Sequence, residues 1–104
     1  MLLKKFKNGN VNVKLETDDK KDDLLIDLIN NLYDLDFGLF GEEYCLNNFT
    51  MGVDLYDYYN NKVITIIYSE LYELKPGYTL KLYSRCLNDY DTELYNELVE
   101  RDEL

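Results

Sequence analysis

Segments rich in β-branched and aromatic side chains, separated by turn residues, constrain the fold of this chain more than any other feature. Two-residue Asn turns and Pro-Gly turns are typical of connections between antiparallel strands. The successive segments and turns are 53–59, Asn60-Asn61, 62–74, Lys75-Pro76-Gly77 and 78–85. Together they predict an antiparallel meander of three strands.

A further hairpin is predicted at the start of the chain. Residues 2–15 contain Asn8-Gly9-Asn10, and Asn and Gly accept the positive φ that a tight turn requires. After this turn Val11, Val13 and Leu15 alternate with polar residues, which indicates a strand with one buried face.

Two helices are expected from apolar residues at steps of three and four. The first covers about residues 19–36, with Gly38 as its terminating residue. Its N-cap candidates are Thr17, Asp18 and Asp19, and its apolar stripe is Leu25, Leu28, Ile29, Leu32 and Leu35. The final helix is capped by Asp89 or Asp91 and has the narrow stripe Leu94, Tyr95, Leu98 and Val99.

These segments occur in the order ββαβββα within a single domain, residues 1–104. Residues 38–52 carry weak signals, and we expect a loop there with a short strand at 43–46. Amphipathic helices and strands must bury their apolar sides against one another. The predicted fold is therefore α+β, an antiparallel sheet of about five strands packed on one face by two helices.

The chain is strongly acidic, with 21 Asp and Glu against 11 Lys and Arg, a net charge of −10. Neutralising phosphate requires the opposite sign, so we expect no direct binding to nucleic acid or to an anionic membrane. Six of the lysines fall within residues 1–21, which makes that end the cationic exception.

Cys45 and Cys86 are the two cysteines, and they do not form a Cys-x-x-Cys pair. This spacing gives no support for a zinc site. The chain has no apolar run near the ~20 residues of a membrane span and no signal-peptide pattern. We therefore expect a cytoplasmic protein with reduced, buried thiols.

The composition argues against an enzyme. The chain has no histidine, so Ser-His or Cys-His catalysis is excluded, and Ser69 and Ser84 lie in strand contexts without a glycine elbow. Adjacent carboxylates, which glycosidases and two-metal nucleases need inside a cleft, are expected to be solvated turn and helix-end residues. They are Asp34 and Asp36, Glu42 and Glu43, Asp54 and Asp57, and Asp89 and Asp91. No cofactor or metal is predicted.

Tyrosine is unusually frequent, with 11 copies. Strand alternation puts Tyr56 and Tyr58 on one face with Asp54, and Asp57 with Tyr59 on the other. Tyrosine is enriched at interface hot spots, because it buries a large rigid area and keeps a hydroxyl for a partner. It also simply suits strands, so a recognition surface and structural filling of the sheet both remain open.

Small size, 21 acidic residues, the stretch Asp54-Leu55-Tyr56-Asp57-Tyr58-Tyr59 and the absence of catalytic residues resemble the small anti-CRISPR and anti-restriction inhibitors of phages and plasmids. The lack of Ala, Gln, His and Trp is also typical of AT-rich coding sequence, as in such elements. The resemblance implies an inhibitor that imitates nucleic-acid phosphates on a basic protein surface, such as that of a CRISPR effector or other nuclease. The partner-binding residues implied are Asp54, Tyr56, Asp57, Tyr58, Glu70, Tyr72, Glu73, Glu93, Glu97 and Glu100.

A second class of function stays open. A structural or regulatory module could associate with itself as a homodimer, or with a host protein, through the Tyr-rich sheet or an exposed strand edge. An antitoxin that neutralises a basic toxin would have the same acidic composition. Salt distinguishes the two classes, because apolar association depends on it little and charge-driven association strongly.

Overall fold

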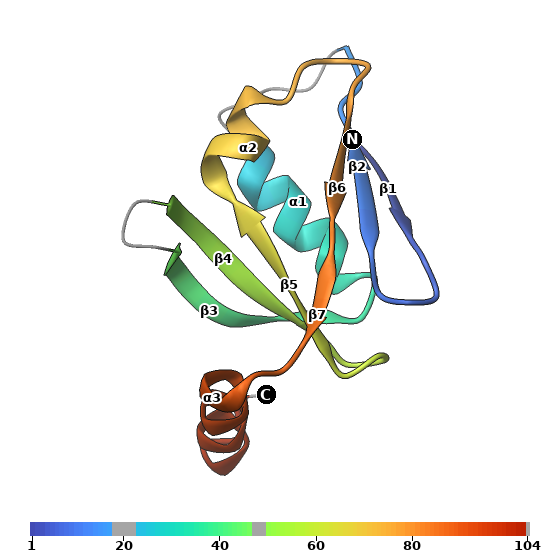
Figure 1. The fold of residues 1–104 in the computed structure, drawn as a ribbon. Coiled ribbons are helices and arrows are strands. Elements are labelled where there is room, and N and C mark those ends of the chain that lie inside the picture. The colour runs from blue at the N-terminus through green and yellow to red at the C-terminus, as the bar shows by residue number, and fades with distance from the viewer. Residues whose placement is uncertain (18–22, 47–49, 104) are drawn as a thin grey trace.

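The computed structural model describes residues 1–17, 23–46 and 50–103, which form seven strands and three helices (Figure 1). The strands are β1 (Leu2–Lys5), β2 (Val11–Lys14), β3 (Phe37–Leu46), β4 (Thr50–Asp57), β5 (Lys62–Ile67), β6 (Thr79–Leu82) and β7 (Ser84–Cys86). The helices are α1 (Leu24–Tyr33), α2 (Tyr68–Glu73) and α3 (Asp89–Glu100).

The strands form two sheets. The three-stranded sheet has the order β1-β2-β6, and the four-stranded sheet has the order β3-β4-β5-β7. All of these neighbours pair antiparallel. Only Tyr83 separates β6 from β7, so the chain passes directly from one sheet into the other.

The main hydrophobic core lies between the two sheets and α1, which crosses behind them in Figure 1. Leu24, Leu28 and Leu32 of α1 recur every four residues and are all buried, because this spacing keeps them on one helical face. The strands contribute alternate residues to this core, among them Val11 and Val13 of β2, Leu55 of β4, Ile64 and Ile66 of β5 and Leu82 of β6.

A second, smaller core lies on the opposite face of the four-stranded sheet. Phe40, Tyr56 and Val63 point to this face and are covered by Leu94, Tyr95 and Leu98 of α3. The four-stranded sheet is therefore apolar on both faces, and α3 is mounted on the side away from α1.

The predicted α+β class, the antiparallel pairing, the hairpin in residues 2–15 and the pairing of 53–59 with the strand that follows are confirmed. The prediction of a single sheet of about five strands with two helices is wrong, because the described residues form seven strands in two sheets and three helices. β3, for which only a short strand within a loop was expected, is a full strand of 10 residues. β7 is a further short strand, and the seven strands are divided between the two sheets.

The segment 62–74 is not one strand, because Tyr68–Glu73 is the helix α2. Tyr68, Leu71 and Leu74 recur every three residues, and Leu71 and Leu74 are buried in the main core. This helical spacing outweighs the strand propensity of the aromatic residues. Lys75-Pro76-Gly77 consequently links a helix to β6 and is not a hairpin turn.

The ends of α1 also differ from prediction. The helix ends at Tyr33, and Asp36, with φ 64°, takes the left-handed position that was expected at Gly38. Gly38 lies in β3, where the ring of Tyr58 occupies the space that a Cβ would need. The cap candidates Asp18 and Asp19 lie outside the described residues, and Asp23 at the N-cap makes no side-chain capping bond.

The turn between β4 and β5 is longer than the two residues predicted. It spans residues 58–61, since β4 ends at Asp57 and β5 begins at Lys62. Asn61 has φ 53°, in agreement with its expected tolerance of positive φ.

Candidate functional site

The helix α3 carries the densest exposed charge in the described part of the chain. Residues 89–103 contain seven carboxylates and a single cation, Arg101, a net charge of −6. Asp91 is buried, whereas the other six carboxylates are exposed: Asp89, Glu93, Glu97, Glu100, Asp102 and Glu103. Figure 1 shows the helix standing at one end of the molecule, below the four-stranded sheet.

Three of these carboxylates form a stripe. Glu93, Glu97 and Glu100 follow one another at steps of four and three residues, which places them on one side of the helix. With a rise of ~1.5 Å per residue, the stripe extends about 10 Å along the axis. Glu97 pairs with Arg101, and both of those side chains are more than half exposed.

The opposite side of α3 is fixed to the sheet by aromatic packing. The ring of Tyr95 lies 5.3 Å from that of Tyr56, which in turn stacks at 5.8 Å on Phe40. Tyr58 meets Tyr56 edge to face at 5.2 Å. These geometries are favourable for ring pairs and hold α3 in one orientation.

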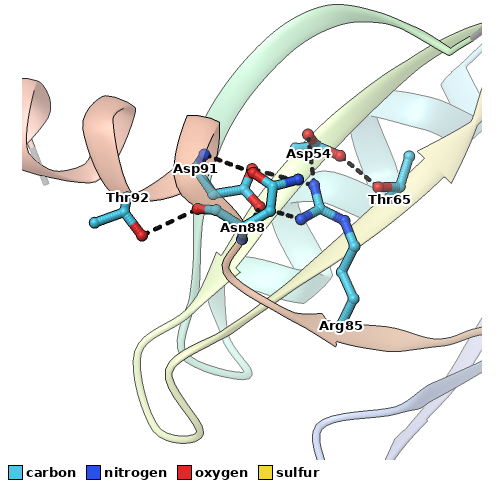
Figure 2. A network of polar contacts seen from close by, with 6 residues as sticks. All are labelled: Asp54, Thr65, Arg85, Asn88, Asp91 and Thr92. Atoms are coloured by element: carbon cyan, nitrogen blue, oxygen red, sulfur yellow. Dashed lines mark hydrogen bonds and ion pairs between the residues drawn. The ribbon is translucent and has the colours of Figure 1, made fainter.

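A network of charges fastens the N-terminus of α3 to the sheet (Figure 2). Arg85 of β7 donates to Asp91 of α3 through both guanidinium nitrogens, and its Nη2 lies 3.3 Å from Asp54 of β4. The hydroxyl of Thr65 donates to the other oxygen of Asp54. Asp54 and Asp91 are 2% and 1% exposed, so two buried carboxylates share the single positive charge of Arg85.

Asn88 completes this attachment as the N-cap of α3. Its Oδ1 accepts from the backbone N–H of Asp91 at 2.8 Å, and the Asp91 carboxylate accepts from the N–H of Asn88 at 2.9 Å. This reciprocal pair is a capping box, which satisfies two N–H groups that the helix start would leave unbonded. The hydroxyl of Thr92 donates to the Asn88 carbonyl at 3.0 Å.

Burial raises the pKa of Asp54, and its hydrogen bond from Thr65 and the charge of Arg85 oppose this shift only in part. The carboxylate of Asp91 nearby adds to the rise in the Asp54 pKa. Burial likewise raises the pKa of the Tyr56 hydroxyl, which donates to Asn61 and therefore stays neutral at physiological pH.

A second buried charge pair lies on the other face of β4. The Lys5 ammonium is 2.9 Å from Asp57, which is fully buried, and also donates to the Leu35 carbonyl at 2.9 Å. Burial would raise the pKa of Asp57, but hydrogen bonds from Asn60 and Lys5 outweigh it and hold that pKa below its usual value. The backbone N–H of Tyr59 also donates to this carboxylate, at 3.0 Å.

The structure divides the predicted partner-binding residues into one buried group and three exposed sets. Asp54, Tyr56 and Asp57 are buried inside the networks above, which corrects their expected place on a solvated sheet face. Their strand alternation was predicted correctly, since Asp54 and Tyr56 face α3 and Asp57 faces Lys5. The face is dry because α3 covers it.

The remaining predicted residues are exposed but lie apart. Tyr58 is half exposed above Gly38. Glu70, Tyr72 and Glu73 are exposed on α2, and Figure 1 places α2 at the end of the molecule opposite α3. The predicted carboxylates that are exposed therefore lie on two helices. Glu93, Glu97 and Glu100 are on the projecting helix α3, and Glu70 and Glu73 are on α2.

Sequence reasoning missed Arg85 and Lys5, the cations that pair with the buried carboxylates. Arg85 is one of two arginines in the chain and precedes the cap residue Asn88 by three positions. An arginine just before a capped helix, in a chain whose other cations are nearly all lysine, was the available signal.

Among the described residues, no group of three Cys, Asp or Glu is placed to hold a metal ion. Cys86 is a free thiol and is exposed, which corrects its expected burial, whereas the side chain of Cys45 lies outside the described part. None of the described helices is both long and apolar enough to cross a membrane.

Comparisons with protein-family models, with curated proteins and with solved structures find no match for this chain.

Proposed function

We propose that this chain is a binding protein that blocks a basic, nucleic-acid-binding surface of another protein, such as a CRISPR effector or a restriction nuclease, as an inhibitor from a phage or plasmid would. Its contact surface is α3. The carboxylates Glu93, Glu97 and Glu100 take the place of nucleic-acid phosphates against Arg and Lys of the partner.

The observation that carries this proposal is a net charge of −6 over residues 89–103, on and just beyond a projecting, rigidly mounted helix. Excess charge of one sign destabilises a small domain through self-repulsion. A cationic partner removes that repulsion and gains fast, oriented association from the complementary field. The Arg85 network and the capping box support this role because a preorganised helix loses little entropy on binding.

The buried carboxylates contribute indirectly. Asp54 and Asp91 hold α3 in place through Arg85, and Asp57 holds the β4–β5 turn, so none of the three touches the partner. Tyr90, which is 62% exposed in the first turn of α3, is an added candidate for a desolvated aromatic contact.

The test is capture of purified CRISPR effectors and restriction enzymes on the immobilised protein, with elution in rising salt. Capture that is released by salt, and that DNA or guide RNA competes away, supports the proposal. The triple variant Glu93→Gln, Glu97→Gln and Glu100→Gln is expected to lose capture. The variant Glu70→Gln with Glu73→Gln on α2 is the matched control and should retain it.

The alternative, a module that associates through its Tyr-rich sheet, has less surface to use, because α3 already covers Tyr56 on that sheet face. Salt-resistant capture, or capture only of a second copy, would count against the inhibitor and in favour of such a module. Equal capture by the triple variant and by the α2 control would also reject α3 as the contact.

A further inference from the structure

The outer face of the three-stranded sheet has the opposite character to α3. Leu3, Val11, Val13, Leu80 and Leu82 point inward to the main core, so the residues between them point outward. The strand register puts Lys4, Asn12 and Lys81 side by side in one row, and Leu2, Lys14 and Thr79 in the next. Lys4, Lys14 and Lys81 are all exposed.

Two aromatic side chains extend this face beyond the ends of the strands. Phe6 is 38% exposed and Tyr83 is 66% exposed. Both line one open pocket of about 280 Å³ together with Asn8, Asn10, Asn12 and Lys81. The ammonium of Lys4 lies 5.0 Å from the centre of the Phe6 ring, which orients this lysine beside the pocket.

None of the outward-pointing strand residues is acidic; they are Leu2, Lys4, Asn12, Lys14, Thr79 and Lys81. Glu16, the first acidic residue of the chain, lies 3.4 Å from the N-terminal amine and is thereby balanced. Asp34 and Asp36 lie beside Phe6 and Lys7 in a neighbouring pocket and limit the cationic face on that side. Figure 1 shows α3 below the other sheet, away from β1 and β2.

We propose that this outer face binds single-stranded nucleic acid. Lysines supply charge for the phosphates, and exposed rings supply stacking surfaces for bases, which is the combination that sequence-tolerant single-strand binding uses. The lysines alone would also suit an acidic protein, whereas the two rings that line the pocket add the stacking surfaces that bases use. The net charge predicted no direct binding to nucleic acid. The local charge of this face decides instead, because charges more than ~8 Å away are largely screened at physiological salt.

The proposal is independent of the proposed role of α3 and can fail without it. Binding of a fluorescent oligothymidylate and an oligouridylate of about 12 nucleotides is measured by anisotropy over a range of salt. Neutralisation of about three phosphates by Lys4, Lys14 and Lys81 predicts a slope of log K against log salt of about −2, and Lys81→Gln is expected to lower its magnitude by about 0.7.

Two variants test the separate parts of the face. Tyr83→Leu is expected to weaken binding about five-fold or more at all salt concentrations, because it removes a stacking surface and no charge. Lys75→Gln, an exposed lysine outside this face, is the matched control and should bind like the parent protein. Circular dichroism of each variant confirms that it is folded.

Absence of binding at about 50 mM salt would overturn the proposal, as would equal effects of Lys81→Gln and Lys75→Gln. Labelled polyglutamate that binds as tightly as the oligonucleotides, with no loss in Tyr83→Leu, would point to an acidic protein partner instead. Concentration-dependent self-association that Lys81→Gln abolishes, seen by sedimentation, would assign the face to α3 of a second copy.

Discussion

Asp54 and Asp57 lie three residues apart on β4, are both buried, and have pKa values shifted in opposite directions. The difference comes from their hydrogen bonds. Asp57 accepts from Lys5, from the side chain of Asn60 and from two backbone N–H groups, whereas Asp54 accepts from Thr65 and shares Arg85 with a second carboxylate. Burial therefore dominates the pKa of Asp54 but not that of Asp57.

Asp57→Asn is expected to lower the free energy of unfolding by about 2 kcal/mol at pH 7, because Lys5 loses its anion and the amide NH2 faces the donor of the Asn60 side chain, while the amide oxygen keeps the two backbone turn bonds. The folded pKa of Asp57 lies below its unfolded value of 3.8, so its stabilisation is complete above that pH and is lost as pH falls through the lower, folded pKa. Urea unfolding from pH 7 to about pH 3 should show the two proteins converging. Asp34→Asn, an exposed carboxylate, serves as control, and a constant difference at all pH values would refute the ion pair.

Arg85→Met is expected to lower the free energy of unfolding by about 2–3 kcal/mol. This is less than the loss of a fully buried ion pair, because the guanidinium is partly exposed. The substitution leaves Asp54 and Asp91 buried without their shared cation. The variant should recover part of its stability as pH falls, because the protonated carboxyls no longer need a partner. Arg101→Met removes an exposed pair with Glu97 and should change the free energy of unfolding by less than about 0.5 kcal/mol. Similar losses in both variants would contradict the network.

At the scale of elements, periodic residues were read correctly and ambiguous ones were not. The alternation in β2 predicted its buried residues, and the apolar stripe in α1 predicted Leu28 and Leu32 but took Leu25 in place of the buried Leu24. In β4 the alternation predicted which residues share a face, but both faces are buried. In Tyr68–Glu73 aromatic propensity favoured a strand, although packing of Leu71 and Leu74 favoured a helix. β3 was missed because two register shifts, between Leu39 and Gly41 and between Gly41 and Tyr44, interrupt its alternation.

The candidate site was predicted in its charge but not in its geometry. The acidic character of the last helix follows from the sequence. The position of Glu93, Glu97 and Glu100 on one side of that helix also follows from their spacing. The burial of Asp54 and Asp57 does not follow, because it depends on Arg85 and Lys5, which are 31 and 52 residues away in the chain. Long-range ion pairs leave no local periodicity.

Two glycines on neighbouring strands give a paired prediction. A Cβ on Gly52 of β4 would meet the backbone carbonyl of Ile66 in β5, which cannot move without breaking the ladder. The atoms nearest to a Cβ on Gly38 of β3 belong to the outer end of the Tyr58 ring, a half-exposed side chain that can swing away. Gly52→Ala should therefore lower the free energy of unfolding by more than about 2 kcal/mol, and Gly38→Ala should lower it by less.

Urea unfolding of a double-mutant cycle checks the reason for this difference. Tyr58→Ala should relieve most of the cost of Gly38→Ala, because it removes the atoms in the way. It should not relieve Gly52→Ala. Rescue of both glycine variants, or of neither, would show that the Tyr58 ring does not cover Gly38 in solution.

At the scale of the whole molecule, charge is segregated. The outer face of the three-stranded sheet carries Lys4, Lys14 and Lys81, while residues 89–103 carry −6 on and beyond α3. A net charge of −10 therefore describes neither surface. Because screening at physiological salt limits each field to about 8 Å, each face presents its own sign to a partner.

Segregation predicts that salt stabilises this protein, and that α3 is the source of much of the effect. Carboxylates spaced three and four residues apart repel one another, and Glu100 also opposes the helix dipole at the C-terminus. Glu93→Gln with Glu97→Gln and Glu100→Gln should therefore raise the free energy of unfolding by about 0.5–1 kcal/mol at low salt, since Gln and Glu have similar helix propensity. The gain should vanish near 1 M salt, where the Debye length is about 3 Å. Urea unfolding of both proteins at low and high salt measures this. A triple variant that is less stable at low salt would mean that Glu97 contributes more through Arg101 than it loses to its neighbours, and that α3 is not under the electrostatic strain from which a cationic partner would release it.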